Sequence, residues 1–160
     1  MTFLRKTLAT WFYAGYFPIA SGTVGTAAAI PFYALMMVLL RAGLGEGAAP
    51  WIAYAAGTIA FTAAAFWIAD CGERFWDEAD TGEIVIDEVA GYLVTMFGLP
   101  FTWTWVLAGF FAFRVLDIVK PWPASHFDRR FKNGFGVVMD DVCAGAYACL
   151  LLHAVRAWTA

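Results

Sequence analysis

Three long stretches of this 160-residue chain contain no Asp, Glu, Lys or Arg, and they limit its possible folds more than any other feature. They cover residues 7–40, 47–69 and 89–113. A helix needs about 20 mostly apolar residues to cross a bilayer, so each stretch is long enough to hold one span. The chain is 62% hydrophobic, whereas soluble domains are about 45–50% apolar. The sequence therefore predicts a membrane protein.

The apolar runs and their breaks predict an all-α fold, a polytopic membrane helical bundle of about four spans plus an N-terminal interfacial helix. One domain is expected over residues 1–160. The interfacial helix is expected over 4–17, because Pro18 ends it. The other helices are expected over 23–40, 50–69, a short 84–99, 102–119 and 137–158. Since Pro18 and the turn at 21–23 interrupt the first apolar run, we expect no cleaved secretory signal.

The basic residues predict an orientation in the membrane. With the N-terminus inside, one side receives Arg5, Lys6, Arg74, Lys120, Arg129, Arg130 and Lys132. The opposite side holds only Arg41 and Arg156, while Arg114 falls within a span. Since positive loops stay in the cytoplasm, the first side is expected to be cytoplasmic. It also holds every acidic residue except Glu46, so the charged chemistry is expected at the cytoplasmic face.

Two acidic pairs start apolar runs in the same way. Asp87 and Glu88 precede Gly91 by about one turn, and Asp140 and Asp141 precede Gly145 similarly. If the two helices cross at their small residues, four carboxylates converge, and bound Mg²⁺ would neutralise them. The alternative is that each pair only complements the positive end of a solvated helix, although one carboxylate would serve that purpose.

A third charged group lies at the end of the fourth predicted span. Arg114, Asp117 and Lys120 recur at helical spacing and share a face. A structural Arg114–Asp117 ion pair is one interpretation. The other makes Asp117 a ligand or an orienting carboxylate and Lys120 a point charge for phosphate.

Small residues precede the first predicted span, in the sequence SGTVGT at 21–26. Glycine lets a backbone approach a ligand closely, and a helix start attracts phosphate. Gly22, Thr23 and Thr26 are therefore candidate substrate contacts, as is Arg130 in the basic loop after the fourth span. Tight packing between helices would explain the small residues equally well.

The chain as a whole resembles the phosphatidylglycerophosphatase A family over roughly residues 15–145. The matching segments are GTVGT at 22–26, IVIDEVAG at 84–91, FRVLDIVKPWP at 113–123, FDRR at 127–130, GFGVVMDD at 134–141 and AG at 144–145. Ser21 stands where the family often has Pro, and Asp80 falls where it tends to carry an acid.

The resemblance implies a Mg²⁺-dependent phosphatase of the bacterial inner membrane, which converts phosphatidylglycerophosphate to phosphatidylglycerol and inorganic phosphate. Catalytic roles would fall to Asp87, Glu88, Asp117 and Asp141, with Asp87, Glu88, Asp140 and Asp141 as metal ligands. Gly22, Thr23, Thr26, Lys120 and Arg130 would bind substrate. Water and an Asp side chain both remain possible nucleophiles.

A different function class is also compatible with buried carboxylates in a small bundle, namely an ion or proton transporter. The acidic pairs lie at span ends rather than at mid-bilayer, and this favours the enzyme. The expected partners are the lipid substrate and the membrane, with no nucleic acid. The sequence does not indicate an oligomeric state.

Overall fold

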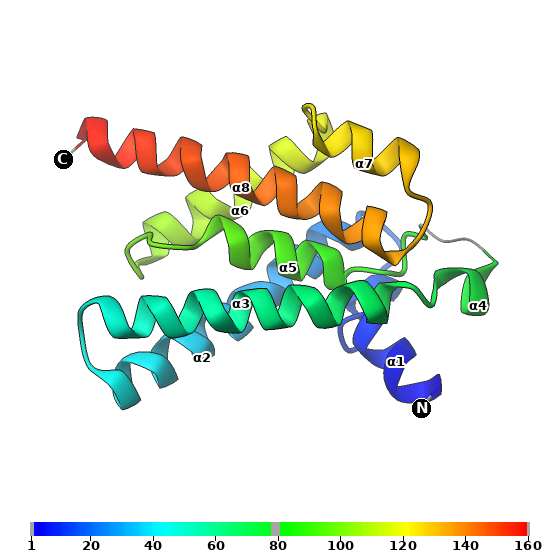
Figure 1. The fold of residues 1–160 in the computed structure, drawn as a ribbon, viewed down its shortest axis with the longest axis horizontal. Coiled ribbons are helices and arrows are strands. Elements are labelled where there is room, and N and C mark those ends of the chain that lie inside the picture. Colours follow the sequence, from blue (N-terminus) through cyan, green and yellow to red (C-terminus); the bar gives the residue numbers. More distant parts are fainter. Residues whose placement is uncertain (1, 78–80, 160) are drawn as a thin grey trace.

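A computed structural model describes residues 2–77 and 81–159, and its regular elements are all helices, as predicted (Figure 1). In chain order they are α1 (Thr2–Ala9), the 3₁₀ helix η1 (Ala14–Tyr16), α2 (Ser21–Leu44), α3 (Ala48–Ala69), α4 (Gly72–Trp76), α5 (Ile86–Thr95), α6 (Trp103–Val119), α7 (Ala124–Arg130) and α8 (Gly134–Thr159). The family-like acidic position Asp80 lies outside the described residues.

Three of the described helices, α2, α3 and α8, are long and apolar enough to cross a membrane. Helix α6 has 17 residues, which is the lower end of the length that can span, and it carries two charged residues. Helix α5 has only 10 residues and is too short. The protein is therefore a polytopic membrane helical protein with three candidate spans, where about four were expected.

The helices and their connections mark two opposite ends of the molecule. The N-terminus, α4, α7 and the start of α8 lie at one end of the molecule, and the α2–α3 connection and the C-terminus lie at the other (Figure 1). Both acidic pairs belong to the first end, at the start of α5 and near the start of α8. This arrangement agrees with the one-sided charge distribution predicted from the sequence.

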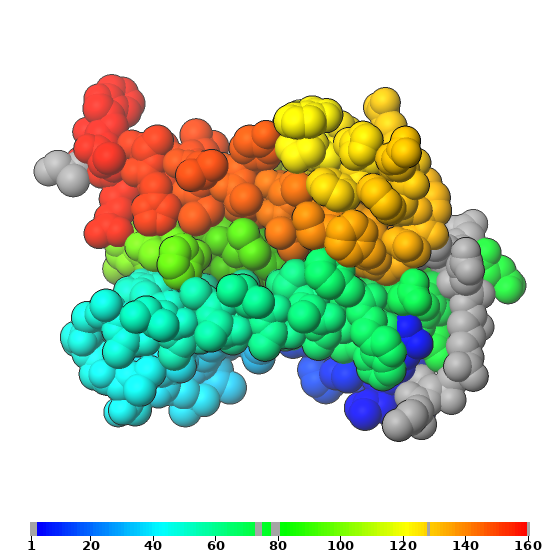
Figure 2. Space-filling view, viewed as in Figure 1, coloured from blue at the N-terminus to red at the C-terminus, as the bar shows by residue number. Residues whose placement is uncertain are grey.

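Short helix α5 lies in the interior, packed mainly against α8, with α2, α3 and α6 around it. In the space-filling view, α3 and α8 meet over α5 toward the end that holds α4 and α7 (Figure 2). Val89, Ala90 and Leu93 are completely buried. Tyr54 on α3 donates a hydrogen bond to the Leu93 carbonyl at 2.7 Å. The surrounding helices thus cover a helix that could not span a bilayer alone.

Helices α5 and α8 cross at the glycines that the sequence singled out. A Cβ added at Gly145 would overlap the carbonyl oxygen of Gly91. A Cβ at Gly91 would lie 2.8 Å from the Asp141 carbonyl oxygen and 2.5 Å from Cε2 of Phe113. Only glycine allows this approach of two backbones. The predicted crossing is confirmed, and it brings the two acidic pairs together.

The N-terminal expectation was wrong in detail, because the helix expected over 4–17 is broken. The Ala9 carbonyl accepts a hydrogen bond from the Val85 N–H at 2.9 Å, and Trp11, Phe12 and Tyr13 all have positive φ angles. The chain therefore turns after α1 to meet the segment before α5.

Other elements also differ from the sequence-based expectation, among them α5, which ends at Thr95 instead of residue 99. Helix α2 begins at Ser21 and continues through Pro31, so the SGT segment forms its first turn instead of preceding it. The basic loop after α6 contains helix α7, which the adjacent prolines concealed.

Candidate active site

Three carboxylates from the α5–α8 crossing form one compact group. Asp87 and Glu88 lie in the first turn of α5 and Asp141 lies on α8, and one oxygen from each falls within 4.8 Å of the others. Oxygen ligands on opposite sides of a Mg²⁺ or Ca²⁺ ion are about 4–5 Å apart. The spread of the three oxygens therefore matches a single divalent cation.

The same three side chains carry buried oxygens that no protein group satisfies. Asp87 Oδ1, Glu88 Oε2 and Asp141 Oδ2 are removed from solvent and have no hydrogen-bond partner among the described residues. Burying an ionised carboxylate without a partner is costly. Hard divalent cations prefer oxygen ligands of this kind. The buried acidic group, named here the acidic triad, therefore fits a metal ion.

Burial also changes the acid–base state of the α5 carboxyls. Loss of hydration raises the pKa of Glu88 to about 8. Loss of hydration, together with the neighbouring Glu88, raises the pKa of Asp87 well above its usual range. In the absence of a cation, Glu88 therefore holds a proton at neutral pH. A bound divalent cation would replace that proton.

Arg114 on α6 lies beside the triad. Its Nη1 lies 2.6 Å from Asp117 Oδ2 and 3.8 Å from Glu88 Oε1. The structure thus confirms the Arg114–Asp117 ion pair that the helical spacing suggested, and it adds an approach to Glu88. The sequence interpretation did not count Arg114 as a site residue. Its position inside a predicted apolar span, where charge is costly, was the available signal.

Asp140 and Lys120 form a second ion pair beside the triad. Lys120 Nζ lies 2.5 Å from Asp140 Oδ2, and Asp140 Oδ1 accepts the Asp141 N–H at 2.9 Å. The compact metal-like group does not include Asp140. With Asp117, the site brings together five carboxylates and two basic side chains, so three negative charges are uncompensated when all are ionised.

The first turn of α2 covers the Glu88–Arg114 contact. A Cβ at Gly22 would overlap Glu88 Oε1 and lie 3.1 Å from Arg114 Nη1. Thr23 is half-buried in the same turn. The hydroxyl of Thr26 is turned into the helix, where it donates to the Gly22 carbonyl at 2.8 Å, and the residue is fully buried. Gly22 therefore joins the site directly, while Thr26 supports its backbone.

Arg130 lies elsewhere on the surface, on α7. It lines a pocket of about 400 Å³ formed with Trp122, Ser125, His126 and Arg129. The structure gives Arg130 no contact with the acidic triad. Its predicted role in substrate binding stays a prediction.

Comparison with known proteins adds to this geometry. The model of the family "Phosphatidylglycerophosphatase A" matches residues 7–156. A phosphatidylglycerophosphatase A of Escherichia coli is 37% identical over 147 residues, which are 91% of this chain and 80% of the relative. One of Haemophilus influenzae is 42% identical over 80 residues, 49% of each chain. A Bacteroides thetaiotaomicron protein, named provisionally as a phosphatidylinositol-3-phosphatase, is 37% identical over 159 residues, 97% of this chain and 95% of its own. No solved structure matches the chain significantly.

Proposed function

Because the chain belongs to the phosphatidylglycerophosphatase A family, it is a phosphomonoester hydrolase that converts phosphatidylglycerophosphate to phosphatidylglycerol, and we propose that the acidic triad is its reaction centre. The observation that carries this proposal is the set of three buried, unpartnered carboxylate oxygens gathered on two crossing helices. Burying such a group costs free energy. A phosphate-cleaving enzyme can use these carboxylates to bind a divalent cation.

In this proposal, Asp87, Glu88 and Asp141 hold Mg²⁺. When bound, that ion supplies positive charge to the phosphoryl oxygens and lowers the pKa of a water molecule beside them. Asp140 lies beside the triad, and we also predict that it is a further ligand of the metal ion. Oxygen ligands and an incomplete protein shell are typical of Mg²⁺ sites that bind phosphate substrates.

The basic side chains stabilise the negative charge that develops on the phosphoryl group as it is transferred. Arg114 lies beside Glu88 and is fixed by Asp117, so it can face the phosphate without a costly rearrangement. Lys120, fixed by Asp140, supplies a second positive charge. The first turn of α2 at Gly22 closes the site with a backbone small enough to lie against Glu88.

We place this site at the cytoplasmic face of a bacterial inner membrane, with α2, α3 and α8 crossing it. The basic residues predicted inside support that orientation, and the relatives compared above are bacterial. A phosphate ester at the membrane boundary can reach the charged end of the bundle while its acyl chains stay in lipid.

Phosphate release from purified protein in detergent tests the proposal. We expect release from phosphatidylglycerophosphate with Mg²⁺, and loss of it with EDTA or in Asp87→Asn and Asp141→Asn. Glu46→Gln is the matched control, because that carboxylate is 81% exposed and pairs only loosely with Arg41, 3.9 Å away, in the α2–α3 connection. Phosphatidylinositol 3-phosphate serves as the competing substrate. Its hydrolysis in place of phosphatidylglycerophosphate, or full turnover by Asp87→Asn, would contradict the proposal.

A further inference from the structure

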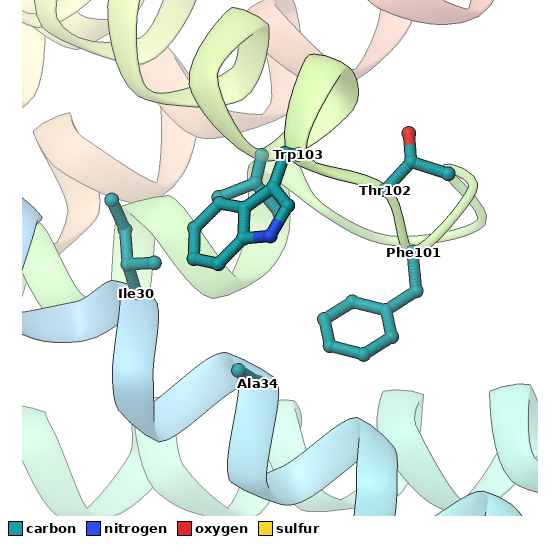
Figure 3. A pocket seen from close by; sticks show the side chains of 6 residues that line it. Ile30, Ala34, Phe101, Thr102 and Trp103 are labelled. Atoms are coloured by element: carbon teal, nitrogen blue, oxygen red, sulfur yellow. The ribbon is translucent and has the colours of Figure 1, made fainter.

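An apolar pocket lies between α2 and the start of α6, far along the bundle from the acidic triad. Its volume is about 130 Å³, and its lining consists of Ile30, Ala34, Phe101, Thr102, Trp103 and Val106. Figure 3 shows the Trp103 ring beside the α2 side chains Ile30 and Ala34, with Phe101 on the adjoining loop. An apolar cavity of about 150 Å³ stays dry and can hold a benzene-sized group. This pocket therefore has room for a short hydrocarbon segment.

The pocket and the triad lie along the same line of contact between α2 and α6. At the charged end, Gly22 lies against Arg114. At the other end, Ile30 and Val106 line the pocket together. Eight residues separate the two positions on each helix, and the helices run in opposite directions. The two helices are therefore paired with the same residue offset at the phosphate site and at the pocket.

This line covers more than half of one leaflet of a bilayer. Eight helical residues rise about 12 Å, and the hydrocarbon core of one leaflet is about 15 Å deep. The phosphate lies outside that core, in an interfacial layer about 5–7 Å thick. A lipid whose phosphate lies beside Gly22 and Arg114 would therefore have the middle of its acyl chains at the depth of Ile30 and Val106.

The partly exposed residues of the site lie where α2 and α6 approach one another. Gly22, Glu88 and Arg114 are half-buried, whereas Asp87 and Asp141 are buried. A larger apolar pocket of about 390 Å³ exists on the α3 side, lined by residues that include Ala55, Val94 and Leu150. This larger pocket is the alternative site for a chain, and the labelling measurement described below distinguishes the two pockets.

We propose that the α2–α6 pocket receives the middle part of one acyl chain of the phosphatidyl substrate while its phosphate occupies the triad. This inference rests on the proposed function. The chain leaves lipid that is already apolar, so the pocket gains little hydrophobic energy. Its contribution is to fix the depth and direction of the lipid. Since misplacement of a reacting group by 1 Å can lower a rate by about 100-fold, chain seating controls turnover of long-chain substrate.

Filling the pocket tests this role. In Ala34→Trp the indole occupies the pocket, and in Leu35→Trp it points from the neighbouring, 57% exposed position. Both variants are assayed with dipalmitoyl and dibutyryl phosphatidylglycerophosphate. We expect the long-chain to short-chain ratio of kcat/KM to fall about tenfold or more in Ala34→Trp and to stay at the wild-type value in Leu35→Trp. An unchanged ratio in Ala34→Trp would overturn the inference.

A binding measurement on the wild-type protein covers the case in which Ala34→Trp does not fold. A non-hydrolysable phosphonate analogue of the lipid, with a diazirine near the middle of one chain, is photolysed on the protein and the labelled peptides are mapped. Labelling at Ile30, Ala34 or Val106 supports the inference. Labelling confined to the α3–α8 pocket, at Ala55 or Leu150, overturns it. If neither substrate releases phosphate in the wild type, the proposed function fails, while the labelling result still reports on the pocket.

Discussion

Replacing Gly22 by alanine tests whether the first turn of α2 belongs to the reaction centre. The added Cβ would overlap Glu88 Oε1 and lie 3.1–3.2 Å from both terminal nitrogens of Arg114. Ordinary carbon contacts need about 3.5 Å, so the carboxylate must retreat by on the order of 1 Å. The colliding atoms end flexible side chains, so they can move without unfolding the helix. We expect kcat to fall on the order of 100-fold, the effect of such a displacement of a reacting group.

The free energy of unfolding of Gly22→Ala should rise slightly or stay unchanged. Alanine favours a helix over glycine by up to about 1 kcal/mol, which offsets the local crowding. Gly43→Ala is the matched control on the same helix, because a Cβ there meets nothing within 4 Å. Phosphate release and thermal unfolding in detergent are measured for both variants. If Gly22→Ala keeps the turnover of Gly43→Ala, the α2 turn does not belong to the site and the reasoning fails.

Three further predictions concern the packing and the charges. Gly145→Ala should force α5 and α8 apart, because its Cβ overlaps the Gly91 backbone, and overpacking costs about 1–3 kcal/mol; an unchanged melting temperature would argue against the crossing. Arg114→Met should destabilise the fold by about 3–5 kcal/mol, because it leaves Asp117 buried without its partner. Denaturant unfolding measures this change. An unchanged free energy of unfolding would mean that water replaces the arginine. Since burial raises the pKa of Glu88 to about 8, cation binding must release its proton, so Mg²⁺ affinity measured by calorimetry should rise with pH up to about 8 and then level off. A pH-independent affinity would show that Glu88 does not lose a proton to the ion.

The sequence was sufficient for features that depend on composition and spacing. Two of the long charge-free runs predicted α2 and α3 within a few residues, because a span must be apolar along its whole length. The third run, 89–113, instead covers parts of α5 and α6. The repeated pattern of an acidic pair followed by glycine predicted the α5–α8 crossing, because both the charges and the close approach are encoded locally. Side-chain partners across helices were less accessible to sequence reasoning.

The missed features depend on tertiary contacts. The helix expected over 4–17 breaks because Val85 donates to the Ala9 carbonyl, and local propensity contains no information about that partner. Arg114 lies close to Glu88 only because α6 runs beside α5. Asp140 turns to Lys120, although it adjoins Asp141 in the chain and carries the same carboxylate. Thr26 matched a phosphate-binding pattern, yet its hydroxyl satisfies its own helix.

Manganese binding followed by electron paramagnetic resonance shows whether the acidic triad holds a divalent cation, because Mn²⁺ prefers the same oxygen ligands as Mg²⁺. We expect tight binding to the wild-type protein, competition by Mg²⁺, and loss of that binding in Asp141→Asn while Glu46→Gln retains it. Equal Mn²⁺ binding by wild-type protein and Asp141→Asn, with both variants folded, would contradict a metal centre at the acidic triad.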